Sequence, residues 1–306
     1  MKMWIAVFVA AFVAGAAAQC PCNTMKWAVC DGPPCQCTLQ LSESLPQSLG
    51  ECKNLVSKCY LMKAEMYRAR TGQSTRSIEG KPVETAFVDN DGIYDPECEN
   101  DGKFKAKQCN NTAECWCVNS AGVRRTDKGD KNIKCEELVE TYWIRLQLKH
   151  KPVANSVNAN NLNVSLVNAM NQRYLNDYSS FVKKVQYDPS ARMIVVDVEK
   201  PPRNPIDLPT MAYYMEKDVK VLPLFLNKGN FTVNVDSQSL QMEEILVYYV
   251  DEKPPTFTMK HLSGGIIAVI VVVVLAVVIG LLVLFFTRKR LSKKYNKAQQ
   301  REMDPM

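Results

Sequence analysis

The stretch GGIIAVIVVVVLAVVIGLLVLFF, residues 264–286, has 23 residues and no charged, amide or hydroxyl side chain. As a helix it would be about 34 Å long, slightly more than the ~30 Å hydrocarbon core of a bilayer. A lone strand in lipid would leave its backbone unpaired, so the helix is preferred despite the many Val and Ile residues. The basic run 288–294, RKRLSKK, follows directly, whereas only Lys260 and His261 stand just before. The positive-inside rule predicts a single-pass protein with residues 287–306 in the cytoplasm and the earlier chain outside.

The predicted transmembrane helix, 264–286, has small residues at spacings that are multiples of four. On one face they would allow a second helix to approach closely, although a Val- and Ile-rich helix that merely tolerates small residues explains them equally well. This helix-packing face comprises Gly264, Ala268, Ala276 and Gly280. In the tail, Ser292 follows the basic residues 288–290 and is a candidate phosphorylation site that would loosen the tail from anionic lipid. The alternative is a plain stop-transfer anchor.

The formal net charge of +6 is concentrated at the cytoplasmic end. The tail after Thr287 holds seven Lys/Arg against two Asp/Glu, and Lys2 adds one more positive charge. Residues 19–263 therefore contain 30 basic and 30 acidic side chains. This balance gives the outer part no bulk attraction for phosphate and argues against nucleic acid as a partner.

Cysteine usage divides the part of the chain that precedes the membrane helix. Residues 1–18 have the basic start, apolar run and small residues of a signal peptide. All 12 Cys lie between Cys20 and Cys135, which predicts disulfides in an oxidising compartment and no metal site. Six of them fall in a small Cys-rich module, 19–55, too short to bury a useful core without cross-links. Six Cys allow 15 connectivities, and spacing alone does not choose among them.

Residues 136–263, which include a short stalk, contain no Cys and must fold around an ordinary hydrophobic core. The apolar periodicity predicts an α+β sandwich, with an antiparallel or mixed sheet and helices on one face. The expected strands are 141–150, 192–199, 231–235 and 244–251, and the expected helices are 161–174 and 207–219. A further helical stretch is expected at 55–68.

The motif CWCV, residues 115–118, is the strongest local signal before the membrane helix. In a strand, Cys115 and Cys117 would face the same side, so each is expected to bond a different segment, one upstream and one downstream, while Trp116 packs locally. Redox chemistry is excluded because it requires two residues between the cysteines and an accessible thiolate. With two His in the whole chain and the cysteines in disulfides, we expect no enzymatic site, no cofactor and no metal.

Residues 56–135 resemble a thyroglobulin type-1 domain. The resemblance rests on DGIYDPEC (91–98), QCN (108–110), CWCV (115–118), Gly122 and Cys135. In that family consecutive cysteines pair first to second, third to fourth and fifth to sixth. The implied disulfides are Cys59–Cys98, Cys109–Cys115 and Cys117–Cys135.

Nearly the whole chain resembles the epithelial cell adhesion molecule family, through stretches such as FKAKQCN (104–110), AYYMEKDVK (212–220) and YYVDEKPP (248–255). For the N-terminal module the resemblance implies the disulfides Cys20–Cys35, Cys22–Cys52 and Cys30–Cys37. It further implies cis dimers formed by the thyroglobulin loop and the Cys-poor domain, epithelial cell–cell adhesion with claudins and tetraspanins as neighbours, and shedding followed by release of the tail. The expected location is the lateral plasma membrane and cell junctions.

Several modification sites are predicted in the outer part. The sequons at Asn110, Asn163 and Asn230 are candidate glycosylation sites. Family members have a basic cleavage site in the long loop, often two adjacent Arg, whereas this chain offers Arg70 and Arg76 for a trypsin-like cut.

Two functions fit the sequence. The first is an adhesion and signalling glycoprotein of epithelial type. The second is a membrane-tethered cysteine-protease inhibitor, because some thyroglobulin type-1 domains wedge into protease clefts. Inhibition requires free loops around 108–110 and 118–125; a glycan at Asn110 and the basic pair Arg124 and Arg125 count against it.

Overall fold

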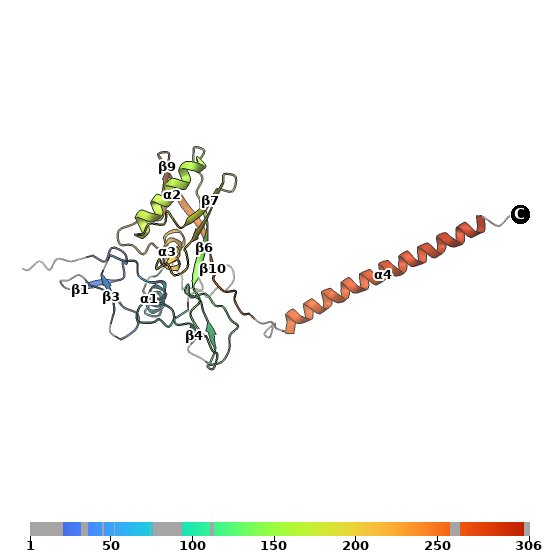
Figure 1. The fold of residues 1–306 in the computed structure, drawn as a ribbon, viewed down its shortest axis with the longest axis horizontal. Coiled ribbons are helices and arrows are strands. Elements are labelled where there is room, and N and C mark those ends of the chain that lie inside the picture. Colours follow the sequence, from blue (N-terminus) through green and yellow to red (C-terminus); the bar gives the residue numbers. More distant parts are fainter. Residues whose placement is uncertain are drawn as a thin grey trace, which may run out of the picture. The chain divides into compact units, whose positions relative to one another are not determined.

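The computed structural model divides the chain into two units, one ending at Thr256 and the other beginning at Phe257. Each unit is described by itself (Figure 1). The predicted signal peptide, 1–18, lies outside the described residues. The structure describes residues 21–31, 36–44, 46–51, 53–73, 75, 94–110, 113–257 and 264–302.

The Cys-poor part folds around a five-stranded antiparallel sheet with the order β7-β8-β6-β10-β9. Apolar side chains at alternate positions of the strands form one buried face, with Ile144, Leu146 and Leu148 in its centre, all 0% exposed. The strands are β6 (Thr141–His150), β7 (Val182–Asp188), β8 (Met193–Glu199), β9 (Thr232–Val235) and β10 (Gln238–Asp251).

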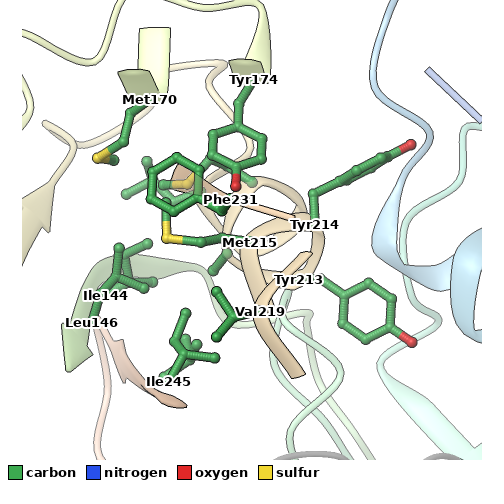
Figure 2. Packing of buried hydrophobic residues seen from close by; sticks show 14 of the residues in the cluster. Ile144, Leu146, Met170, Tyr174, Tyr213, Tyr214, Met215, Val219, Phe231 and Ile245 are labelled. Atoms are coloured by element: carbon green, nitrogen blue, oxygen red, sulfur yellow. The ribbon is translucent and has the colours of Figure 1, made fainter. Parts of the chain in front are cut away.

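Helices α2 (Ala159–Tyr174) and α3 (Leu208–Glu216) share one hydrophobic core with the buried face of this sheet (Figure 1). The Asn158 side chain caps α2 by accepting hydrogen bonds from two backbone amides of the first turn, and Asp207 caps α3 in the same way. Figure 2 shows Met170 and Tyr174 of α2 packed in this core. The predicted α+β sandwich is therefore confirmed.

A five-residue π-helix, η1 (Lys217–Val221), continues from α3. The expected helix 207–219 is thus α-helical only as far as Glu216. Beyond it the helix is π-helical, and each backbone hydrogen bond spans one residue more than in an α-helix. Both Lys217 and Asp218 are 1% exposed although they are adjacent in sequence.

Two elements of the sheet differ from the sequence expectation. Strand β7 was not expected, because its start carries Lys183 and Lys184 and it lies at the sheet edge, where only part of each side chain is buried. Strand β10 begins at Gln238, six residues before the expected start. A tight turn at Asp236 and Ser237, both with positive φ, joins it directly to β9.

The N-terminal module contains a three-stranded sheet, and the disulfide described in this module differs from the expected pairing. The structure joins Cys22 to Cys37, with sulfurs 2.01 Å apart, whereas the resemblance implied Cys22–Cys52 and Cys30–Cys37. The physical reason is the turn at 22–25, held by the Met25 amide on the Cys22 carbonyl, which buries Cys22 against Cys37. The strands are β1 (Val29–Asp31), β2 (Gln36–Leu39) and β3 (Gln47–Glu51).

Cys30 lies directly opposite Cys37 across the β1–β2 ladder and is disulfide bonded. The other cysteines of the expected pairs, Cys20, Cys35 and Cys52, fall outside the described residues. The position of Cys30 opposite Cys37 therefore does not identify the partner of Cys37, because Cys22 bonds the Cys37 sulfur from the turn before β1.

The middle module has helix α1 (Lys58–Arg70) and a small two-stranded sheet of β4 (Lys107–Cys109) and β5 (Cys115–Cys117). Helix α1 begins three residues later than expected, after Ser57. The three disulfides of the middle module are the pairs that the resemblance implied: Cys59–Cys98, Cys109–Cys115 and Cys117–Cys135.

The second unit is one long helix, α4 (Gly264–Glu302). Within the described residues, it is the one helix long and apolar enough to cross a membrane, over Ala268–Lys289. The helix does not end at Phe286, because the tail is rich in Lys, Arg and Gln, which are good helix formers. The predicted membrane helix and the first part of the tail are thus continuous.

Leu146 and Leu246 lie on opposite faces of the sheet and provide a test of the core. Leu146 is fully buried, whereas Leu246 is 38% exposed on β10. Replacing Leu146 by Ala should lower the free energy of unfolding by about 2–5 kcal/mol, because it leaves a cavity. The same change at Leu246 should cost about 0.5 kcal/mol. Denaturant unfolding of the full chain in detergent measures both, and equal losses would contradict this assignment of the core.

Candidate functional site

The β4–β5 hairpin shows how CWCV is used. Cys109 lies opposite Cys115 in the ladder and bonds it, while Cys117 bonds Cys135 further along the chain. As expected for two cysteines on one side of a strand, one fixes the upstream segment and the other the downstream segment.

Trp116 is 5% exposed and forms an edge contact with Tyr94, their ring centroids 5.5 Å apart. Gln108, opposite Trp116, is fully buried. Its amide accepts from the Glu97 amide at 2.7 Å and donates to the Glu97 and Lys105 carbonyls at 2.8 and 2.7 Å. All its hydrogen bonds are therefore used within the module, which excludes Gln108 as a contact residue for a protease cleft.

Hydrogen bonds within the loop after CWCV fix its conformation. The Asn119 side-chain oxygen accepts hydrogen bonds from the Ala121 and Val123 amides. Gly122 adopts a φ of +75°, and a Cβ atom there would come within 2.5 Å of the Phe104 ring. Gly122 is thus required both for its backbone conformation and for close packing.

The same loop is docked on the Cys-poor domain through Asp251, at the end of β10. Its carboxylate accepts from the Asn119 amide at 2.8 Å, from the Thr141 hydroxyl at 2.8 Å and from the Arg125 guanidinium at 2.9 Å. Arg125 also donates to the carbonyls of Lys253 and Pro254. The loop 118–125 is therefore part of a domain interface, and Val123 is its one exposed residue, with Ser120, Arg124 and Arg125 half-buried.

Helix α1 of the middle module contacts α3 and η1 through a buried ion pair. Lys217 and Glu65 lie 2.8 Å apart, and their side chains are 2% and 1% exposed. Tyr213 donates a hydrogen bond to the same carboxylate at 2.9 Å. Figure 2 shows Tyr213 directed away from the sheet core, toward the N-terminal part of the chain.

Further hydrogen bonds connect all three modules. The Lys58 amide donates to the Thr210 hydroxyl, and the Val56 amide to the Tyr214 hydroxyl. The Tyr214 hydroxyl in turn donates to the Thr24 carbonyl of the N-terminal module, and burial raises the pKa of this phenol. Residues up to Thr256 accordingly form a single unit instead of three independently moving domains.

The second face of the sheet carries exposed apolar side chains. Leu246 and Tyr248, on β10, are 38% and 46% exposed and alternate with the buried Ile245 and Val247. Arg145 of β6, opposite Tyr248, makes a bidentate contact with Asp197 of β8 at 2.7 and 3.0 Å. The polar pair next to the two apolar side chains makes this open face a candidate protein-binding surface.

The predicted modification sites lie at the surface where the structure describes them. Asn110 is exposed at the end of β4, Asn163 is exposed on α2, and Asn230 is exposed just before β9. Arg70, at the end of α1, is exposed and forms an ion pair with Asp95 at 2.8 Å, whereas Arg76 falls outside the described residues. The helix-packing residues Gly264, Ala268, Ala276 and Gly280, together with Ser292, are all in α4.

Sequence reasoning did not identify the domain interface or the open sheet face. Glu65, Lys217 and Asp251 look like ordinary surface charges in the sequence. The strict alternation of β10 at 245–248 was the one signal available, and it indicated which side chains would face outward.

The fold and these surfaces define a membrane-anchored, disulfide-rich α+β protein with a thyroglobulin type-1 module. Residues 65–135 match the thyroglobulin type-1 repeat, and residues 141–251 match the EPCAM/Trop-2 C-terminal family. The chain is similar to human tumor-associated calcium signal transducer 2, with 42% identity over 99% of this chain and 94% of the relative. It is 43% identical to the human epithelial cell adhesion molecule, over 96% of this chain and 92% of that protein. The bovine epithelial cell adhesion molecule is 46% identical, over 89% and 84%. The chain belongs to the EpCAM/Trop-2 family.

Replacing Gly122 by Ala should destabilise the protein by more than about 2 kcal/mol, because it adds a clash with Phe104 to an unfavourable backbone conformation. Gly72 is the matched control, since its φ is +73° but nothing lies within 4 Å of its Cβ position. Gly72→Ala should cost about 1 kcal/mol. Thermal unfolding measures the two changes, and similar losses would show that Phe104 does not constrain the loop.

Breaking the Glu65–Lys217 pair should cost about 3–5 kcal/mol in either single variant, Glu65→Gln or Lys217→Met, because one buried charge remains unpaired. Replacing both, Glu65→Gln with Lys217→Met, should recover most of the loss, because no buried charge then remains unpaired. Denaturant unfolding of the three variants gives the coupling energy. Additive single losses would mean that the pair does not hold the modules together.

Proposed function

We propose that this protein is a single-pass surface glycoprotein that mediates adhesion between epithelial cells and transmits a signal from the contact. Family membership over nearly the whole chain is the observation that carries the proposal. The apolar helix followed by a basic tail supports a topology with residues 19–263 outside and 287–306 in the cytoplasm. Glycans at Asn110, Asn163 and Asn230 agree with the exposure of these side chains.

The adhesive unit that we propose is a cis dimer built on the open face of the sheet. Exposed Leu246 and Tyr248 supply apolar contact area, and the neighbouring Arg145–Asp197 pair supplies polar contacts that fix orientation. The small residues of α4 allow the two membrane helices to approach each other. Claudins and tetraspanins would be neighbours of the dimer at lateral membranes and cell junctions.

Signalling would depend on proteolytic release of the tail. A cut at Arg70 or Arg76 and shedding of the outer part would precede cleavage within α4, and phosphorylation of Ser292 would weaken the hold of the basic tail on anionic lipid.

The alternative, inhibition of a cysteine protease, is less well supported. Insertion into a protease cleft requires the loop 118–125 to be free, but two residues of this loop, Asn119 and Arg125, bind Asp251. The hydrogen bonds of the Gln108 side chain inside the module also argue against inhibition, because they leave this side chain no contact with a protease.

A double variant, Leu246→Lys with Tyr248→Lys, should reduce surface cross-linking of the full chain about tenfold or more, because it places charge in an apolar contact. Cell aggregation should fall with it. Val164→Lys is the control for charge at an exposed apolar side chain on another element, since Val164 is 62% exposed on α2 and its change preserves the Asn163 sequon. Cells that lose the cross-linked dimer but aggregate normally would contradict the dimer as the adhesive unit, and unchanged aggregation after deletion of residues 21–256 would contradict adhesion itself.

A further inference from the structure

The chain that leaves the sheet domain toward the membrane helix is docked on the middle module. We call residues 252–256, which directly follow β10, the stalk segment. All five residues are exposed, so no apolar side chain of the segment is buried. Hydrogen bonds and ion pairs within the first unit are therefore what hold it in place.

Arg125, at the end of the loop 118–125, binds the stalk segment at two backbone carbonyls. One of its terminal guanidinium nitrogens donates to the Lys253 carbonyl at 2.5 Å and to the Pro254 carbonyl at 2.9 Å. Its Nε atom lies 2.9 Å from the Asp251 carboxylate, which orients the guanidinium. The Arg125 side chain is 11% exposed, so water competes little for these contacts.

Backbone hydrogen bonds fix both ends of the stalk segment. The Glu252 amide donates to the Glu140 carbonyl at 3.1 Å, and the Thr256 amide donates to the Arg125 carbonyl at 2.9 Å. Thr256 also forms a parallel β-bridge with Thr126. Arg125 thus holds the segment through both its side chain and its backbone.

These contacts bear on how a protease could cut the segment. An endoprotease acts on exposed chain whose backbone is extended and free to form hydrogen bonds with the cleft. In the stalk segment, several of these backbone groups are already bonded to the middle module. The segment must therefore leave the module before it is cut, and the rate of cleavage follows the population of the released form. Because its side chains are exposed, this release does not require the domain to unfold.

We propose that Arg125 restrains shedding by holding the stalk segment on the middle module, and that release from Arg125 admits the shedding protease. The protease would add water across a peptide bond of the segment, which leaves a new carboxylate on the outer part and a new amine on the membrane-bound part. Arg125 acts here as a positioning residue. The inference rests on the proposed function for the occurrence of shedding, whereas the docking of the segment is tested independently of it.

The test digests the full chain, in detergent micelles, with endoproteinase Glu-C and measures the initial rate of cleavage after Glu252 by mass spectrometry. Arg125→Lys should raise this rate about tenfold, because an ammonium group can still pair with Asp251 but lacks the planar fork that also reaches the two carbonyls.

Arg173→Lys is the matched control. Arg173 makes a similar set of contacts elsewhere in the first unit, bidentate with Asp218 and with the Gly229 carbonyl, and its side chain is 15% exposed. The control should change the rate of cleavage after Glu252 less than about twofold, because it leaves the stalk segment docked.

A second variant loosens the segment without changing the contact between Arg125 and Asp251. Thr256→Pro removes the amide that donates to the Arg125 carbonyl and should raise the rate about fivefold, whereas Thr256→Ala keeps the amide and should change it less than about twofold. Thermal unfolding checks that all variants remain folded. Digestion of the urea-unfolded chains corrects for any effect of sequence on the enzyme itself.

Equal acceleration by Arg125→Lys and Arg173→Lys would overturn the proposal, because a general loss of stability would then explain it. Unchanged cleavage in both Arg125→Lys and Thr256→Pro would overturn it as well. On cells, the same two variants should release more of the outer part into the medium, and release that does not respond to them would overturn Arg125 as the restraint. No release even from the unaltered chain would contradict the proposed shedding, while the Glu-C rates would still decide whether Arg125 holds the segment.

Discussion

The ion pair between Glu65 and Lys217 lies at the centre of the contact between helix α1 and the Cys-poor domain, and both side chains are removed from water. A charge in such a place is stable only while its partner is present. The Tyr213 hydroxyl completes the hydrogen bonding of the carboxylate. The disulfide-bonded modules and the sheet domain therefore have one favourable arrangement, because any displacement would leave an unpaired charge in an apolar contact.

This constraint bears on how the outer part of the protein can act. A rigid unit presents its surfaces at fixed positions relative to one another, which favours recognition by shape over adaptation of a mobile loop. The thyroglobulin-type loop shows the effect, because its polar side chains are directed to Asp251 and the end of β10. The surface that we propose for partners is therefore the open sheet face.

The sequence predicted most elements of the Cys-poor domain but not the contacts between modules. Alternating Ile144, Leu146 and Leu148 predicted β6, and the spacing in CWCV predicted two separate disulfides. Strand β7 escaped notice because Lys183 and Lys184 obscure its pattern at an edge. The Cys22–Cys37 disulfide depends on a local turn, which spacing does not encode.

The candidate site was harder to predict for a related reason. Hydrophobic periodicity identifies which side of an element is buried, but it does not identify which charged residue meets which across an interface. Lys217 and Asp218 have charged neighbours in sequence, Glu216 and Lys220, and nothing local distinguishes them from charges at a protein surface. Family resemblance supplied the module order and three disulfides, while the interface became visible only from the fold.

The π-helical turn η1 gives these two residues different partners. In a regular α-helix, consecutive side chains point about 100° apart, and one of the two would ordinarily face solvent. Here Lys217 binds Glu65 of α1, while Asp218 binds Arg173 and Tyr174 of α2. The short segment Lys217–Asp218 thus binds two helices, α1 through the ion pair with Glu65 and α2 through the ion pair with Arg173. Because the two residues are adjacent, displacing Asp218 from Arg173 would disturb the backbone that also positions Lys217.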